Sequence, residues 1–214
     1  MFQLTLTFDN GPDPDVTPEV LDTLAQHDVR ATFFVIGKKL LPKGHIAIVR
    51  RVRDAGHWVG NHTWSHSTPL GEHASSGTAA AEIKKTQVLL GDLAYPPRLF
   101  RPAGKGGGIG RHLLNREALD LLTRDKYTCV LWNSVPRDWL DPDGWVQRAL
   151  DHCREQAWTL MVLHDLPTGA MRHLSQFLDR VVQSGGTIRQ EFPPECVPIE
   201  QGRVLRPIEN LVSS

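Results

Sequence analysis

Short runs of apolar and β-branched residues alternate with longer amphipathic segments, and this alternation limits the folds open to the chain. The runs predict strands over residues 4–8, 31–36, 57–60, 99–100, 127–132 and 159–163. The amphipathic segments predict helices over residues 17–26, 46–55, 78–90, 115–124, 143–154 and 171–183. Strands separated by helices of about 10–15 residues are typical of βαβ units in a parallel sheet. Roughly six or seven such units favour a closed or nearly closed β/α barrel over an open sheet.

Length and charge exclude several classes of protein. A chain of 214 residues is suited to one domain, which we place at residues 1–190, with an irregular tail at 191–214 packed on it. Lys plus Arg (24) equals Asp plus Glu (24), so we expect no cationic face for nucleic acid. No apolar run approaches the ~20 residues of a membrane span. No leader pattern is present, so we expect a cytoplasmic protein unless a leader was removed.

The three cysteines, Cys129, Cys153 and Cys196, form no CxxC pair. That arrangement argues against a disulfide framework and against a cysteine zinc site. We therefore expect buried, reduced thiols.

Two histidines follow the third expected strand. In parallel β/α folds, reactive side chains lie at the carboxyl ends of strands. The spacing of His62 and His66 places two imidazoles on one face of a helical turn, where both reach one metal ion. Neutral imidazole suits Zn, Co, Ni or Fe. Alone, the pair is also compatible with surface or cap histidines, but its position after a strand favours a metal.

Asp9 follows the first expected strand and is a candidate general base. The alternative is an Asx-turn, because the segment 9–12 reads Asp-Asn-Gly-Pro, and the two roles are compatible. Arg101 follows the fourth strand and is a candidate partner that would lower the pKa of Asp9. Its alternative is an ordinary surface ion pair.

His164 follows the sixth expected strand and is a candidate general acid for a leaving amine, with Asp138 orienting it. A satisfied core histidine is the alternative. Trp64 and Trp139 lie within the strand-end clusters and are placed to stack on a sugar face or wall a pocket, whereas Trp132, Trp145 and Trp158 are expected in the core. The glycine-rich segment 104–110 matches no phosphate-binding pattern. We interpret it as a flexible loop near the site, with Lys105 touching substrate.

These motifs, in this order, resemble those of the polysaccharide deacetylases with NodB homology, carbohydrate esterase family 4. The motifs that carry the resemblance are Thr-Phe-Asp-Asn-Gly-Pro at 7–12, His-Thr-Trp-Ser-His at 62–66, Phe-Arg-Pro at 100–102, Asp-Trp at 138–139 and Leu-His-Asp at 163–165. The similarity spans nearly the whole chain. It implies a distorted (β/α)7-type barrel and metal-dependent N-deacetylation of chitin, chitooligosaccharide or peptidoglycan. The implied metal is zinc, with cobalt or nickel as alternatives, and the implied partner is a carbohydrate or other N-acylated substrate.

The resemblance also assigns roles to residues. It implies Asp9 as base with Arg101 as its partner, and His164 as acid with Asp138 as its partner. It implies His62 and His66 as metal ligands. Leu163 falls on the residue that receives the acetyl methyl group.

Three positions depart from the family pattern. Asn10 replaces a second aspartate, and its amide oxygen can ligate a metal only without charge. Gly104 replaces an aromatic residue; its backbone N–H still serves an oxyanion hole, but the aromatic wall is expected to be lost. Val135 replaces an aspartate. These departures leave two alternatives open, namely a small-molecule amide hydrolase of the same superfamily and a carbohydrate-binding pseudoenzyme.

Overall fold

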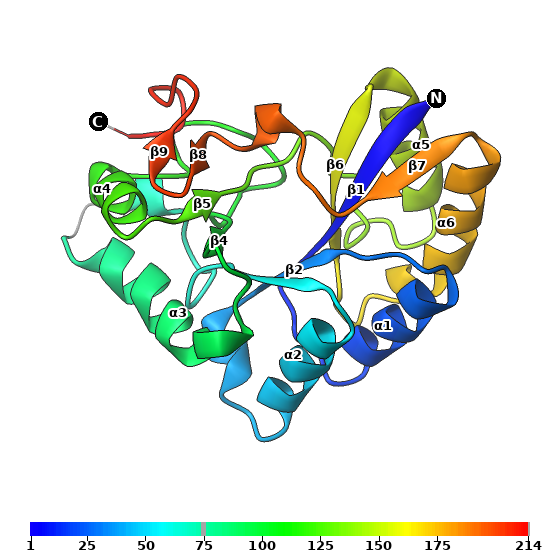
Figure 1. Ribbon diagram of the computed structural model, residues 1–214, viewed down its shortest axis with the longest axis horizontal. Coiled ribbons are helices and arrows are strands. Elements are labelled where there is room, and N and C mark those ends of the chain that lie inside the picture. The colour runs from blue at the N-terminus through cyan, green and yellow to red at the C-terminus, as the bar shows by residue number, and fades with distance from the viewer. Residues whose placement is uncertain (74–75, 214) are drawn as a thin grey trace.

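Parallel strands form the centre of the computed structural model, which describes residues 1–73 and 76–213 (Figure 1). The strands are β1 (Phe2–Asp9), β2 (Thr32–Val35), β3 (Trp58–Asn61), β4 (Leu99–Phe100), β5 (Thr128–Cys129) and β6 (Trp158–His164). They pair in the order β6-β1-β2-β3-β4-β5, every pair parallel. The chain beyond β5 returns to β6, where Ser134 forms a parallel bridge with Met161. The result is a distorted β/α barrel, as expected.

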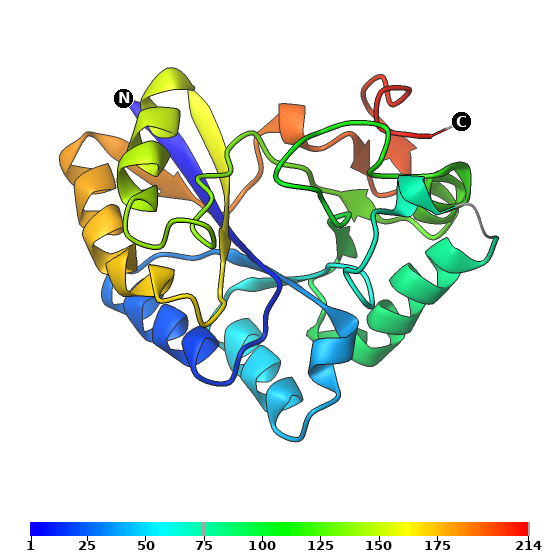
Figure 2. The same cartoon turned by 180° about the vertical axis from the view of Figure 1, so that it is seen from behind.

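Helices surround the strands on the outside (Figures 1 and 2). The α-helices are α1 (Val16–Gln26), α2 (His45–Asp54), α3 (Lys85–Leu90), α4 (Arg116–Arg124), α5 (Trp145–Glu155) and α6 (Leu174–Gln183). A π-helix at Ala80–Lys84 leads into α3, and short 3-10 helices lie at Gly37–Leu40, Leu70–Glu72, Gly91–Leu93, Ala170–His173 and Pro194–Cys196. Every predicted strand and helix has a counterpart, although β5 is shorter than the predicted 127–132. No helix in the described ranges is long and apolar enough to cross a bilayer.

Three further strands differ from the expectation. β7 (Gly186–Arg189) pairs in parallel with β1, and β8 (Ile199–Glu200) and β9 (Arg203–Val204) extend the sheet antiparallel from β5. The segment expected as an irregular tail therefore contributes two short strands. Two-residue strands have too little alternation for a periodicity argument to find.

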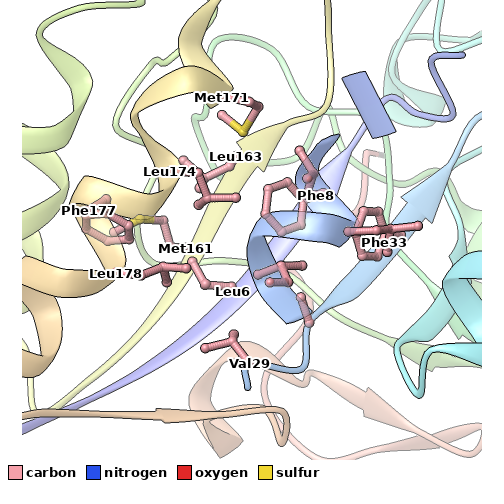
Figure 3. Packing of buried hydrophobic residues seen from close by; sticks show 14 of the residues in the cluster. Leu6, Phe8, Val29, Phe33, Met161, Leu163, Met171, Leu174, Phe177 and Leu178 are labelled. Carbon is pink, nitrogen blue, oxygen red and sulfur yellow. The ribbon is translucent and has the colours of Figure 1, made fainter. Parts of the chain in front are cut away.

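The side chains of β1 and β6 alternate between two environments. Residues Leu4, Leu6, Phe8, Met161 and Leu163 pack outward against the helices in one apolar cluster. Figure 3 shows Leu163 beside Leu174 of α6 and Met171 of the preceding 3-10 helix. Burying each such side chain contributes about 1.5–3 kcal/mol, so this layer stabilises the strands on which the site depends.

The opposite face of β1 points into the barrel and is polar. Thr5, Thr7 and Asp9 are all buried there. Buried polar groups need hydrogen-bond partners, and the Thr7 hydroxyl donates to the Met161 carbonyl at 2.7 Å. The three cysteines are buried and unpaired, as expected. A polar barrel interior that opens at Asp9 sets the position of the site.

Candidate active site

A cavity of about 300 Å³ opens at the carboxyl ends of β1, β3 and β6. Among the expected site residues, those that line it are Asp9, Asn10, His62, His66, Gly104, Trp139 and His164. Arg101 and Asp138 lie behind them, fully buried. The fold therefore brings segments more than 150 residues apart in sequence to one small volume.

Arg101 holds Asp9 in place. Its Nη1 donates to Asp9 Oδ1 at 2.8 Å and to the Thr7 hydroxyl at 2.6 Å, and its Nε and Nη2 donate to backbone carbonyls. Burial alone would raise the pKa of Asp9, but the charge and hydrogen bond of Arg101, together with the nearby His62 and His164, outweigh it and hold that pKa below its ordinary value. Asp9 is therefore a carboxylate near neutral pH. Its second oxygen, Oδ2, lies 3.5 Å from His62 Nε2.

His164 is oriented by Asp138. His164 Nδ1 lies 2.9 Å from Asp138 Oδ1, and the His164 backbone N–H donates to Asp138 Oδ2. A carboxylate accepts only, so Nδ1 carries the hydrogen and Nε2 is left for chemistry. Burial would lower the pKa of His164, but the hydrogen bond and charge of Asp138, together with the charges of Asp9 and Asp165, outweigh it and raise that pKa above its ordinary value. The Trp139 ring packs edge-on against the imidazole at 4.7 Å.

His62 and His66 lie in a loop rather than on the helical turn that their spacing suggested. Thr63 and His66 adopt left-handed backbone conformations, with φ of 64° and 51°. The two rings nevertheless meet, with centroids 4.7 Å apart. The loop differs from a helix because its backbone bonds to side chains, which compete with helical hydrogen bonds.

The side chains that shape this loop come from two neighbouring elements. At the end of β3, Asn61 Oδ1 accepts from the Thr63 N–H, and the Thr63 hydroxyl accepts from the His66 N–H. From the π-helix, Glu82 Oε2 accepts from the N–H groups of Trp64 and Ser65. π-Helical turns are frequent at functional sites. Glu82 was not singled out in the sequence, because nothing local marks it.

The donor atoms fit a metal ion. His62 Nδ1 lies 2.9 Å from the Arg101 carbonyl, which only accepts, so His62 Nε2 is unprotonated and available as a ligand. Burial lowers the pKa of His62 to about 3 and also lowers that of His66, which keeps both imidazoles neutral. Asn10 Oδ1 is buried and has no hydrogen-bond partner in the described structure. A cation would satisfy that oxygen.

The third donor of such a site would be an amide. Within residues 1–73 and 76–213, no three His, Cys, Asp or Glu side chains are grouped to hold a metal. Asn10 completes the set only as a neutral oxygen donor. Its φ of 74° is one that asparagine tolerates well. Next to it, a Cβ on Gly11 would lie 2.2 Å from Asp165 Oδ2, so only glycine fits there.

Trp132 occupies the space beside Gly104, so an aromatic wall is present where its loss was expected. A Cβ on Gly104 would lie 3.0 Å from the Trp132 ring. The Trp132 indole donates to the Gly107 carbonyl at 2.8 Å, and both residues line the cavity. Trp132 was expected in the core, and it is buried in an apolar cluster there, but it also lines the cavity, which was not expected. Gly104, which lies against the Trp132 ring, was the sequence signal that could have placed Trp132 at the cavity.

Two expected substrate-binding residues lie outside the cavity. Leu163 points into the apolar layer between β6 and the helices, because strand side chains alternate and His164 points inward. Val162, two residues before His164, lines the cavity instead, together with Leu166. Trp64 packs against Gly37 and under Lys85, whose Nζ lies 3.6 Å from the ring centroid.

Comparison with known proteins agrees with this geometry. The family model described as "Polysaccharide deacetylase" matches residues 2–129. The chain is 32% identical over 183 residues to a peptidoglycan-N-acetylglucosamine deacetylase of Bacillus cereus, covering 84% of this chain and 62% of that protein. It is 37% identical over 162 residues to a chitooligosaccharide deacetylase of Rhizobium leguminosarum bv. trifolii, covering 75% of this chain and 70% of that one.

A solved structure resembles the fold closely. A family 4 acetyl xylan esterase from Clostridium thermocellum, in complex with a cobalt ion, superimposes with a TM-score of 0.70 at 25% identity. The match covers 88% of this chain and 87% of that one. In that relative, therefore, the same fold holds a metal ion.

Proposed function

This chain belongs to the polysaccharide deacetylase family, and we propose that it removes N-acetyl groups from GlcNAc-type polysaccharides or oligosaccharides by metal-dependent hydrolysis. One observation carries the proposal. Asp9 and His164 face the same cavity from paired strands, and each has its own buried ionic partner. Carbohydrate binding alone does not require a carboxylate with a lowered pKa facing an imidazole with a raised pKa. Groups whose pKa values are pushed apart are typical of an acid–base pair.

The metal is proposed to be zinc, with cobalt or nickel as alternatives, held by His62, His66 and Asn10. Deacetylases of this family depend on a metal, and a relative holds cobalt. A divalent cation supplies Lewis-acid polarisation of a carbonyl and a lowered pKa for water. The support from this chain is the neutral state of both imidazoles and the unsatisfied Asn10 oxygen.

In the proposed reaction, water attacks the acetamide carbonyl and Asp9 accepts the proton of that water. The lowered pKa of Asp9 keeps it ionised and able to accept. Gly104 lines the cavity, and its backbone N–H has no backbone acceptor in the described structure, which suits it to an oxyanion. Val162 and Leu166 supply apolar surface for the acetyl methyl group.

His164 completes the reaction by donating a proton from Nε2 to the departing amine as the carbon–nitrogen bond breaks. Asp138 favours the imidazolium form and fixes the ring. The products are acetate and a free amino sugar. Trp132 and Trp139 offer flat apolar surfaces suited to the C–H face of a sugar ring.

Acetate release tests the proposal. The protein is stripped with a chelator, reloaded with Zn, Co or Ni, and supplied with chitooligosaccharide or partly acetylated peptidoglycan. We expect release that depends on the metal and that a His164→Gln variant loses. Release that is unchanged without metal, or unchanged in the variant, would overturn the proposal.

A carbohydrate-binding protein without turnover is the second candidate, and Asn10 is the observation that favours it. An uncharged ligand weakens a metal site, because ligand charge count sets much of the affinity. Binding of both glycans by calorimetry, with no acetate released under any metal, would select this candidate.

A further inference from the structure

Two valines, Val135 and Val162, lie side by side on the inner face of the barrel and are here called the valine pair. Ser134 forms a parallel bridge with Met161, so the next residues of the two segments lie opposite each other. Met161 belongs to the outer apolar layer (Figure 3), so the pair, one residue further on, faces inward and lines the active-site cavity. Val162 stands two residues before His164 on β6, which places the pair one side-chain layer deeper in the barrel.

The surroundings of the valine pair are apolar. Val162 belongs to one buried cluster with Trp132 and Leu160, and Val135 packs against that cluster. The family pattern leads us to expect an aspartate in place of Val135, and its carboxylate would set a charge beside any group bound there. Instead the isopropyl group packs against Gly107, where a Cβ would lie 3.1 Å away. The deep end of the cavity therefore presents hydrocarbon to a ligand.

Thr7 is the polar neighbour of the valine pair, and its hydroxyl is already bonded. It is in register with Val162 across the β1–β6 pair. The hydroxyl donates to the Met161 carbonyl at 2.7 Å and accepts from Arg101 Nη1 at 2.6 Å. A polar substituent at the end of an acyl chain would lose its water contacts here without replacement. An unsubstituted hydrocarbon chain fits this end of the cavity best.

The acyl group of an amide substrate points towards the valine pair. The sugar is on the nitrogen side of the scissile bond and needs the open mouth of the cavity, so the acyl group extends inward. Successive inward side chains on a strand are about 6.6 Å apart, whereas an acetyl methyl lies only about 1.5 Å beyond its carbonyl carbon. A carbonyl held at the level of Asp9 and His164 therefore leaves space above Val162 for a longer chain.

We propose that the cavity takes N-acyl groups longer than acetyl, with the valine pair as the apolar subsite for the end of the chain. The substrates are then N-propionyl and N-butyryl amino sugars as well as N-acetyl ones. This inference rests on the proposed function and names the acyl group of that site. The hydrolysis balances as it does for acetyl. Water adds its oxygen to the carbonyl carbon, the carbon–nitrogen bond breaks, the amine takes the proton, and propionate or butyrate leaves.

Three glucosamine tetramers that differ only in the acyl group test the inference: the N-acetyl, N-propionyl and N-butyryl forms. The release of free amine by the zinc-loaded protein is measured for each. We expect the N-propionyl tetramer to have a kcat/KM about two- to fourfold higher than the N-acetyl tetramer, because a buried methylene group favours binding. A kcat/KM that is tenfold or more lower for the N-propionyl tetramer would overturn the inference.

A change in the size of Val162 should move the preference in either direction. Val162→Leu fills the space and should lower the ratio of N-propionyl to N-acetyl kcat/KM at least tenfold. Val162→Ala deepens the cavity and should raise the ratio of N-butyryl to N-propionyl kcat/KM. Val135→Asp should lower both ratios, because the acyl chain would desolvate the new charge. Each ratio is taken within one variant, so a partial loss of folded or metal-loaded protein leaves it unchanged.

Val182→Leu is the matched control, because Val182 is an exposed valine of α6 outside the cavity. It should leave both ratios unchanged. Ratios that neither Val162→Leu nor Val135→Asp alters would overturn the inference while the deacetylase function stands. If no tetramer is hydrolysed with any metal, the proposed function fails, and calorimetry of the same tetramers decides the subsite separately. Tighter binding of the N-propionyl tetramer that Val162→Leu abolishes would then support the subsite, and equal binding of all three would overturn it.

Discussion

Asp9 and His164 are register partners at the carboxyl ends of β1 and β6, so the two groups project from adjacent strands of one parallel pair. Their buried partners come from elsewhere: Arg101 follows β4, and Asp138 lies in the segment between β5 and α5. The apolar layer behind both strands includes Phe8 and Leu163 (Figure 3). Packing on the outer face thus positions the polar groups on the inner face.

We expect His164→Gln and Asp9→Asn each to lower kcat by about 10²–10⁴, because both act in proton transfer. Combining them should cost much less than the product of the single effects, since the groups act in one step. Steady-state kinetics with circular dichroism as a folding check measures this. Asp9→Asn also leaves Arg101 without its buried counter-charge, so we expect a loss of stability of about 3–5 kcal/mol. A loss of kcat under threefold in both single variants would contradict their roles.

Asn10→Asp should raise the affinity for Zn²⁺ by about tenfold or more, because a charged oxygen replaces a neutral one at the same place. Titration calorimetry on the chelator-treated protein measures it without reference to turnover. Asn10→Ala should lower the affinity, because it deletes the buried oxygen that has no other partner in the described structure. Equal zinc affinities for the three proteins would show that residue 10 is not a ligand.

The sequence predicted the barrel, and most of the residues that it singled out meet at one cavity, because both depend on local patterns. Apolar runs identified the strands, and polar residues at their ends identified Asp9, His62 and His164. The error at Leu163 was one of parity: a shift of one residue exchanges the two faces of a strand. Because His164 faces inward, Val162 was the position to choose.

Other features depend on distant contacts and have no local signal. β5 ends early because the chain after it makes hydrogen bonds elsewhere. The Leu131 N–H donates to the Cys196 carbonyl, and the Ser134 N–H donates to the Leu160 carbonyl. This path of the backbone places Trp132 at the wall of the cavity, beside Gly104. The loop that carries His66 is shaped by Glu82, which lies in the π-helix Ala80–Lys84, beyond the 3-10 helix Leu70–Glu72. Spacing alone predicted a helical turn there, whereas the two imidazoles meet on a loop.

Trp132→Leu should raise KM for oligosaccharides about three- to tenfold with a smaller change in kcat, because it removes a wall of the cavity rather than a reacting group. Trp58→Leu is the control: Trp58 stacks on Tyr95, at the amino end of β3, outside the cavity. Kinetics on chitotetraose compares the two. An unchanged KM in Trp132→Leu, or an equal rise in both variants, would remove Trp132 from the substrate wall.

Asp165 makes folding stability depend on pH. Burial raises its pKa to about 7, only partly offset by the hydrogen bond from Thr17, and its Oδ1 has no partner in the described ranges. The folded state therefore holds this proton more tightly than the unfolded state, whose pKa is near 4. The penalty is absent below pH 4, grows as pH rises to about 7, and is constant above it.

Asp165→Asn keeps the acceptor for Thr17 and removes the titrating proton. We therefore expect the variant to gain about 1–3 kcal/mol over the natural protein between pH 4.5 and pH 7.5, and little below pH 4. Denaturant unfolding at four pH values in that window measures the difference. Asp179→Asn, an exposed site on α6, is the control and should show no such trend. A gap between Asp165→Asn and the natural protein that stays constant with pH would show that Asp165 is already ionised in the folded state.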